Sequence, residues 1–322
     1  MTRSYVPGII FMRKYWGAEM TDFARLMNDY FVKYLIGQKG SGNNTLKTYR
    51  DTFVQLLEFM DEKKQIQADR IEVDNFSYDI INEFLEYLEK EKGVSISTRN
   101  NRLAAIRSFF KYTGYHEPKY LNISSSIREI SKKKAENRQM NYLSINAMEH
   151  FLNSFDTTDY KELRCFCIVL LLYESGARVT ELCNVHRYDL HLEKPFTLVL
   201  HGKGNKIRSV PLDGLVVDTI SNYIQKYEVH DDDFLFFNAR RERLTREGVN
   251  YIVRKYFERA RMDAVSMYPP AISAHCLRHS KAMHLLENGV NLVYIRDLLG
   301  HASVTTTEVY SKANPEVKRK YL

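Results

Sequence analysis

The sequence has few of the residues that mark secreted, metal-bound or membrane-spanning chains. It contains four cysteines, seven prolines and one tryptophan among 322 residues. The cysteines have neither the spacing of zinc ligands nor the density of a disulfide scaffold, so we expect reduced thiols packed in a core. There is no apolar run of 18 residues and no charged-then-apolar leader. The sequence therefore predicts a cytoplasmic protein without membrane spans.

What the chain does have is length and positive charge. A chain of this length can form two ordinary domains, each with its own core. The formal net charge is +7 and the isoelectric point is near 9.0. Such an excess favours a polyanionic partner, although a ribosomal or membrane-surface protein would fit the charge equally well.

The first part of the chain shows the three- and four-residue apolar spacing of amphipathic helices. Four helices are predicted within residues 19–117, with a glycine-rich break at 37–42. Because helices of this length with short connections form small bundles, these residues are predicted to be one domain. Residues 1–18 lack a clear period and are interpreted as an arm. The polar stretch 118–141 is predicted to be a linker.

Residues 142–314 are predicted to form a second domain, in which the pattern of apolar residues changes part-way. Between 196 and 212, apolar and polar residues alternate on both sides of a glycine-rich turn. This alternation predicts a β-hairpin with Lys203 at its tip. The expected fold class is mainly α with a small β-hairpin or sheet, which is an α+β fold. Residues 315–322 remain as a tail.

The most informative stretch lies near the end of the chain. His275 and Arg278 are three residues apart, so on a helix they share a face. A second short helix is predicted to end at Gly300, directly before His301, and Tyr310 follows nine residues later. Imidazole, guanidinium and phenol groups together suit a phosphodiester, which needs cationic donors on its oxygens and a nucleophile in line with the bond that breaks.

These residues carry a family resemblance. The strings HCLRH, LLENG, LLGH and TTEVY occur in that order and resemble the C-terminal signature of tyrosine recombinases. Upstream, SGARVTEL resembles the first catalytic-arginine box of that family and HGKGNKIRSVPL its catalytic-lysine hairpin. STRNNRLAAIRSFFKY is similar to its helical, SAM-like core-binding domain. The resemblance extends over about residues 21–312.

The resemblance implies a site-specific recombinase that cleaves and rejoins DNA. Tyr310 would attack the scissile phosphate, forming a 3′-phosphotyrosyl link and a free 5′-hydroxyl. The two arginines would bind the non-bridging oxygens, Lys203 would act as general acid, and His275 is the candidate base. The implied catalytic residues are Arg178, Lys203, His275, Arg278, His301 and Tyr310. No metal and no cofactor are expected, because the cationic side chains neutralise the developing charge.

Two further residues are expected to support this set. Glu181 would orient Arg178 by hydrogen bonding, although the two residues could equally form a surface ion pair. His279 would either assist catalysis or pack behind Arg278.

The resemblance also changes how the basic clusters are interpreted. An isolated basic cluster is most often a solvated face, but here its sign agrees with the net charge and helix starts offer amide donors to phosphate. The residues predicted to contact the DNA backbone are Lys47, Tyr49, Arg50, Arg99, Arg102, Lys206, Arg208, Arg241 and Arg243.

Three readings remain open on the sequence: a recombinase, a type IB topoisomerase with similar chemistry, and a DNA-binding protein that has lost the chemistry. The intact catalytic set favours an enzyme. The expected partner is double-stranded DNA, bound by a homotetramer on paired sites, with a monomer when free. An accessory or directionality factor would be a further partner. Whether the task is integration, resolution or transposition stays open.

Overall fold

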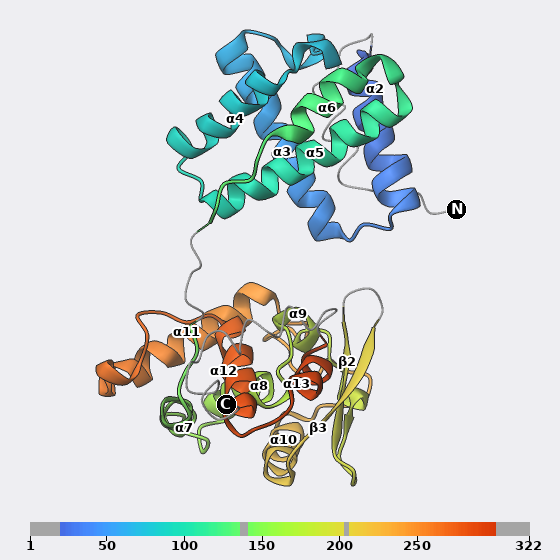
Figure 1. Cartoon of the computed structure of the whole chain (residues 1–322). Helices are drawn as coiled ribbons and strands as arrows, with labels where there is room; N and C mark the ends of the chain where they lie inside the picture. Colours follow the sequence, from blue (N-terminus) through green and yellow to red (C-terminus); the bar gives the residue numbers. More distant parts are fainter. Residues whose placement is uncertain (1–19, 136–140, 203–205, 301–322) are drawn as a thin grey trace. The chain divides into compact units, whose positions relative to one another are not determined.

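In the computed structural model the chain forms two compact units, residues Met1–Asn137 and Arg138–Leu322 (Figure 1). The structure describes residues 20–135, 141–202 and 206–300. The fold class predicted from the sequence is confirmed, because both units are built from helices and only the second contains a small sheet among the described residues. None of the described helices is long and apolar enough to cross a membrane.

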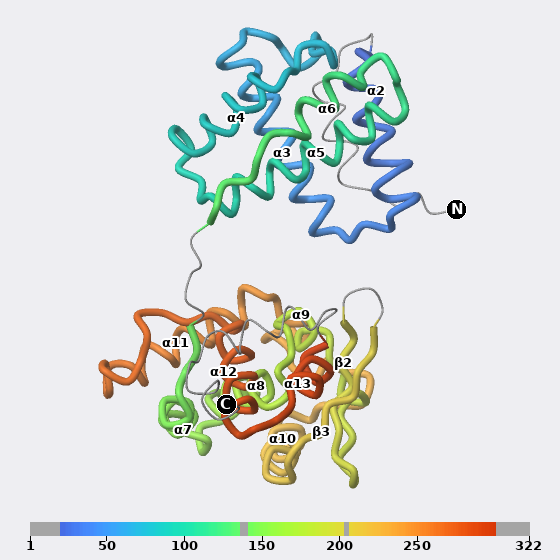
Figure 2. The backbone as a smooth tube through the Cα atoms, viewed as in Figure 1, coloured from blue at the N-terminus to red at the C-terminus, as the bar shows by residue number. Residues whose placement is uncertain are grey.

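The first unit contains the four predicted helices, which the tube in Figure 2 shows as successive blue-to-green coils. Three of them begin where a hydroxyl side chain accepts a bond from a backbone N–H three residues on: at Thr21, Ser77 and Ser95. The helical elements are α2 (Asp22–Asp29), its π-helical continuation η1 (Tyr30–Gln38), α3 (Asn43–Lys64), η2 (Ala68–Arg70), η3 (Val73–Asn75), α4 (Tyr78–Lys90), α5 (Ile96–His116), η4 (Pro118–Tyr120) and α6 (Leu121–Glu129).

Helix α6 corrects the prediction for residues 118–141. We expected a linker there because serines and lysines dominate the stretch. Ile127 and Ile130 are nevertheless buried in the first unit's core, and α6 packs against α5. Among its many polar residues, the stretch has apolar residues at steps of three and four. This spacing is sufficient for one short helix whose apolar face packs against α5.

Aromatic rings fill the centre of the first unit. Phe109 of α5 is completely buried, and its ring lies 5.2–5.5 Å, centroid to centroid, from those of Phe23, Tyr30, Phe53 and Phe110. These pairs are edge-to-face, the arrangement that aromatic quadrupoles favour. Phe109 therefore joins α2, η1 and α3 to α5.

The second unit surrounds one buried helix with the others and places a three-stranded antiparallel sheet at its side (Figure 1). The predicted hairpin is confirmed as β2 and β3, which pair from Thr197↔Pro211 to His201↔Ile207. A short strand before it, β1, was not predicted. The elements are α7 (Ile145–Asn153), α8 (Tyr160–Ser175), α9 (Val179–Leu182), η5 (Arg187–Asp189), β1 (Leu190–His191), β2 (Thr197–His201), β3 (Ile207–Pro211), α10 (Gly214–Tyr227), α11 (Arg246–Asp263), η6 (Val265–Met267), α12 (Ala274–Glu287) and α13 (Leu292–Leu299).

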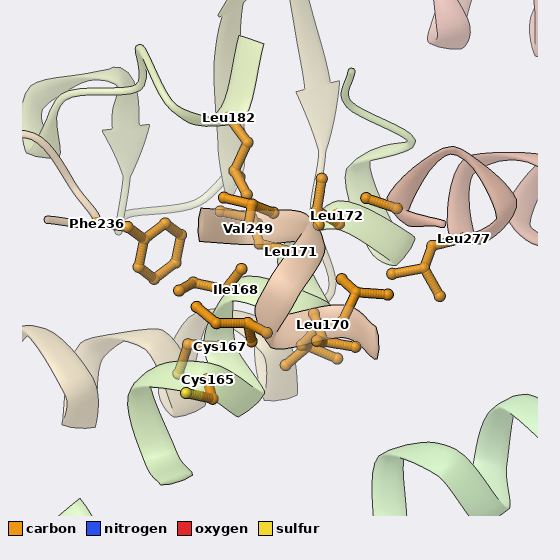
Figure 3. Packing of buried hydrophobic residues seen from close by; sticks show 14 of the residues in the cluster. Cys165, Cys167, Ile168, Leu170, Leu171, Leu172, Leu182, Phe236, Val249 and Leu277 are labelled. Atoms are coloured by element: carbon orange, nitrogen blue, oxygen red, sulfur yellow. The ribbon is translucent and has the colours of Figure 1, made fainter. Parts of the chain in front are cut away.

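Helix α8 is the buried helix. Figure 3 shows its side chains among Leu182, Phe236, Val249 and Leu277, which come from four other segments. All four cysteines are free and buried, as expected of core residues, and burial raises the pKa of the Cys167 thiol to about 12. A helix packed in this way gives α12, which lies against it, a fixed base.

The ring cluster generates a stability prediction. Phe109→Ala is expected to lower the free energy of unfolding of the first unit by about 3–5 kcal/mol, because it leaves a cavity between four rings. Urea denaturation of the full chain, followed by circular dichroism, measures the change. The control is Tyr115→Ala on the same helix, where the ring is 84% exposed and the expected change is within about 0.5 kcal/mol. Equal effects of the two substitutions would contradict the packing described.

Candidate active site

Arg178 and Glu181 are fixed by the turn between α8 and α9. Gly176 ends α8 with a φ of +57°, a conformation that side chains resist, and Arg178 follows as the N-cap residue of α9. The backbone N–H of Arg178 donates to Oε2 of Glu181 at 2.8 Å, and its Nη1 donates to Oε1 at 2.8 Å. The side chain of Glu181 is 3% exposed and that of Arg178 is 36% exposed, so this is not a surface ion pair. Glu181 thus accepts bonds from both the backbone and the side chain of Arg178.

The carboxylate of Glu181 has a second cationic partner that the sequence did not predict. Arg208 of β3 donates from Nη1 to Oε1 at 3.0 Å and from Nη2 to Oε2 at 2.7 Å. Burial alone would raise the pKa of Glu181, but hydrogen bonds from Arg208 and from Arg178 lower it to about 2. Glu181 is therefore an anion throughout the physiological pH range.

The prediction that Arg208 contacts the DNA backbone is accordingly wrong, since its side chain is 12% exposed and bonded inward. The alternation of residues along β3 already indicated this inward orientation. Residues two apart on a strand share a face, and Val210, two residues on, is fully buried. Arg208 had to point toward the interior with it.

Arg278 lies on α12 and is 1% exposed. Its Nη1 donates to the carbonyl of Gly176 and its Nη2 to the carbonyl of Leu299, both at 2.6 Å. A guanidinium has donors in a fixed planar fork. Two carbonyls from different segments therefore set both the position and the plane of this group.

His275 and His279 lie one turn apart on the same helix, with ring centroids 4.2 Å apart in an edge-to-face arrangement. Part of the His275 side chain is open to solvent while the rest is enclosed by protein, and His279 is half-buried. Desolvation lowers the pKa of His275 below its usual value, and the positive charges of Arg278, Arg178 and Arg246 lower it further. The neutral imidazole that a general base requires is thus favoured at neutral pH.

Three predicted catalytic residues, Lys203, His301 and Tyr310, lie outside the described residues. Their neighbours in the chain are described. The N–H of Gly202 donates to the carbonyl of Lys206 at 2.7 Å, which closes the hairpin on either side of Lys203. Gly300 ends α13 with a φ of +63°, and its carbonyl accepts a bond from Nη2 of Arg178 at 3.2 Å.

Helix α12 also holds the segment by which the chain enters the second unit. The backbone of Leu143 is bonded on both sides: its N–H donates to Ser280 and its carbonyl lies 2.8 Å from Nε2 of His284. Sequence reasoning missed this role, because a histidine and a serine in a helix carry no mark of what they bind.

Both units of the chain match known protein families. Residues 141–316 match the profile described as "Phage integrase family", and residues 29–114 match "Phage integrase, N-terminal SAM-like domain". The chain belongs to the phage integrase family. It is a tyrosine-type site-specific DNA recombinase, an enzyme that breaks and rejoins DNA through a covalent tyrosine intermediate.

Individual members of this family cover nearly the whole chain. Tyrosine recombinase XerA of Thermococcus onnurineus is 32% identical over 88% of this chain and 89% of its own. Tyrosine recombinase XerD of Listeria innocua is 31% identical over 88% of this chain and 92% of its own. Among solved structures, a post-cleavage complex of XerH recombinase with its palindromic difH substrate has a TM-score of 0.70 at 20% identity, covering 97% and 92% of the two chains. That last likeness concerns the fold.

Family membership decides between the three readings of the sequence. The chain is similar over most of its length to proteins named as recombinases. The readings as a topoisomerase and as an inactive binding protein are set aside.

The structure contradicts some of the predicted DNA contacts of this recombinase and leaves the others as predictions. The predicted DNA contact of Arg99 is wrong. The residue is 4% exposed, forms an ion pair with Glu89 at 3.2 Å and donates to the carbonyl of Ser131 at 3.1 Å. The spacing of basic residues on α5 indicates an outer face, but Arg99 instead bonds the segment that follows α6. Arg102 is half-buried and bonds Thr48 on α3.

The remaining contacts stay predictions. Lys47, Lys206, Arg241 and Arg243 are exposed, as a backbone contact requires. Arg50 pairs with Asp51 at 3.0 Å, and Tyr49 packs at the margin of the first unit's core.

These placements predict different outcomes for two basic residues of the first unit. Lys47→Ala is expected to reduce the slope of log affinity for duplex DNA against log salt by about one, because one phosphate contact is lost. Arg99→Met is expected to leave that slope unchanged and to lower the denaturation midpoint instead. Fluorescence anisotropy across a salt series measures the slopes. Equal reductions for both variants would show that Arg99 does reach DNA.

Proposed function

We propose that the residues of this recombinase act as the family resemblance implies, with Tyr310 as nucleophile. The observation that carries the proposal is the convergence of Arg178 and Arg278. Their guanidinium groups bond the carbonyls of the consecutive residues Leu299 and Gly300, directly before His301 in the chain. A forked donor pair beside a neutral imidazole is the environment that a pentacoordinate phosphate requires.

In the proposed step the phenolic oxygen of Tyr310 attacks the scissile phosphorus as its proton passes to His275. The bond from phosphorus to the 5′ oxygen breaks, and that oxygen takes a proton from Lys203. The product is a 3′-phosphotyrosyl link and a free 5′-hydroxyl. The 5′-hydroxyl of a partner strand then attacks the phosphotyrosine and reverses the step. Because the phosphotyrosyl link conserves the energy of the phosphodiester bond, rejoining needs no external energy source.

Arg178, Arg278 and His301 would donate to the non-bridging oxygens. Each Nη atom of an arginine carries two N–H groups. The bonds from Arg178 to Glu181 and Gly300 therefore leave donors on a side chain that is one-third exposed.

The substrate of this chemistry is double-stranded DNA, gripped through the exposed cations of both units. Strand exchange needs two duplexes and four cleavages, so the proposed active assembly is a homotetramer on paired sites, with a monomer when free. Residues 315–322, which lie outside the described residues, carry Val317, Tyr321 and Leu322 among basic neighbours. A small apolar patch of this kind needs a surface to cover it, and a neighbouring protomer would provide one.

The first test concerns the nucleophile. Tyr310→Phe removes the attacking oxygen and nothing else, so the covalent adduct should disappear while duplex affinity stays within about twofold of wild type. Denaturing electrophoresis of the protein on a suicide duplex scores the adduct. An adduct that persists in the Phe variant would assign the nucleophile to another residue.

The second test concerns assembly. Deletion of residues 316–322 should leave affinity for a single half-site unchanged, yet weaken pairing of sites and lower recombination at least about tenfold, roughly 1.4 kcal/mol in coupling. Gel shifts and a recombination assay measure the two quantities. A full-length chain with Lys318→Ala and Lys320→Ala serves as control, since it keeps the apolar residues and loses only charge. Recombination at the full rate by the truncated protein would exclude the tail as a contact between protomers.

A further inference from the structure

The end of α13 collects three arginines from three different segments. The carbonyl of Leu298 accepts from Nε of Arg208 at 2.8 Å, that of Leu299 from Arg278 at 2.6 Å, and that of Gly300 from Arg178 at 3.2 Å. The last carbonyls of a helix have no intrahelical partner and carry partial negative charge. Guanidinium groups therefore satisfy this helix end in place of water.

Arg208 differs from the other two arginines in how many of its nitrogen atoms bond protein groups. Its Nε bonds Leu298, and its Nη1 and Nη2 bond the two oxygens of Glu181. Each of its three nitrogen atoms thus bonds the protein, on a side chain that is 12% exposed. Arg208 is placed to hold other groups.

Those other groups belong to the phosphate site. Glu181 shares its Oε1 between Arg208 and Arg178, so Arg208 fixes the carboxylate that orients Arg178. The same guanidinium holds the helix end whose next two carbonyls hold Arg278 and Arg178. One side chain on β3 therefore supports both arginines by two separate routes.

Close packing gives this arrangement little freedom. A Cβ on Gly300 would stand 3.0 Å from Nη1 and 3.2 Å from Cδ of Arg208. On the other side, a Cβ on Gly202 would stand 3.2 Å from Oε1 of Glu181. Two glycines thus allow the backbone of the hairpin and of the α13 end to approach the Arg208–Glu181 pair directly.

We propose that Arg208 is a positioning residue for DNA cleavage, which holds Glu181 and the end of α13 so that Arg178 and Arg278 meet the scissile phosphate. This inference rests on the catalytic set proposed above. Arg208 itself does not touch the substrate, and its effect falls on the rate of cleavage rather than on DNA affinity.

The central experiment compares Arg208→Met with wild type in single-turnover cleavage of a saturating suicide duplex. We expect a loss of about 10–100-fold in rate, the usual effect of removing a supporting partner, with duplex affinity within about twofold. The matched control is Arg296→Met on α13, where the lost partner is the exposed carboxylate of Asp297; its rate should equal that of wild type. Unchanged rates for Arg208→Met would overturn the proposal.

A pH profile separates positioning from a general loss of structure. Without Arg208, Glu181 stays buried with one cationic partner, so its pKa rises. Since only the ionised carboxylate orients Arg178, cleavage by Arg208→Met should fall off at a higher pH on the acid side than cleavage by wild type. Adding Glu181→Gln should remove this shift, because no titrating carboxyl remains. An Arg208→Met profile parallel to that of wild type would count against the role.

Sulfur in place of the 5′ leaving oxygen identifies which catalytic group is affected. A thiolate leaves without protonation, so Lys203→Ala should regain cleavage on this substrate, whereas Arg208→Met and Arg278→Ala should not. Rescue of Arg208→Met would mean that the residue acts through the lysine hairpin, against the inference.

Arg208→Lys keeps the test decisive if the Met variant does not fold. A lysine keeps the charge but is a single point donor, and it cannot bond both oxygens of Glu181 and the carbonyl of Leu298. Its expected rate is about tenfold below wild type, and a wild-type rate overturns the proposal. Absence of a Tyr310-dependent adduct in the wild-type chain would instead overturn the catalytic set, and the positioning role with it. If the wild-type chain forms the adduct and both Arg208 variants cleave at the full rate, the positioning role is rejected and the catalytic set is not.

Discussion

The catalytic unit depends on one buried anion. Glu181 lies at the start of α9 with a side chain that is 3% exposed, and a carboxylate in that position is costly unless its oxygens are bonded. Arg178 and Arg208 supply those bonds from the turn after α8 and from β3. Removal of one partner of such a group typically costs about 3–5 kcal/mol, because the remaining charge stays buried. The anion thus ties two segments that are distant in sequence to one point.

This constraint explains how the protein itself holds the arginines of the site in place. The positive groups that a phosphate needs would repel one another if they faced only solvent and each other. Here the Glu181 carboxylate and four backbone carbonyls accept bonds from these guanidinium groups and fix their positions. Electrostatic stabilisation that is organised before the reaction avoids reorganisation during it. The pKa of His275 is lowered first by desolvation, and the neighbouring cations lower it further because they disfavour another positive charge.

The sequence predicted well whatever has a local period or a local motif. Helices with three- and four-residue spacing, the hairpin around Lys203 and the Arg178–Glu181 pair all depend on residues close in the chain. It failed where a partner comes from elsewhere. Arg99 and Arg208 were both assigned to DNA, yet each bonds the protein, at Glu89 and at Glu181. An arginine on an amphipathic element carries the same letters whether it faces water or a buried carboxylate, and only the tertiary structure supplies that carboxylate. Helix α6 was missed for the related reason that its few apolar residues matter only beside α5.

Gly300 carries a consequence for how this sequence can change. Position 300 has two separate requirements: a φ of +63°, and a close approach to Arg208 that a methyl group would allow only if the arginine shifted. A smaller side chain at 208 would lift the second demand and leave the first in force. Substitutions at the two positions therefore compensate for each other only in part, because the positive φ of residue 300 does not depend on residue 208. Replacing Gly300 and replacing Arg208 are therefore separate steps in evolution, and each is unfavourable by itself. We expect descendants of this chain that keep the chemistry to keep both residues.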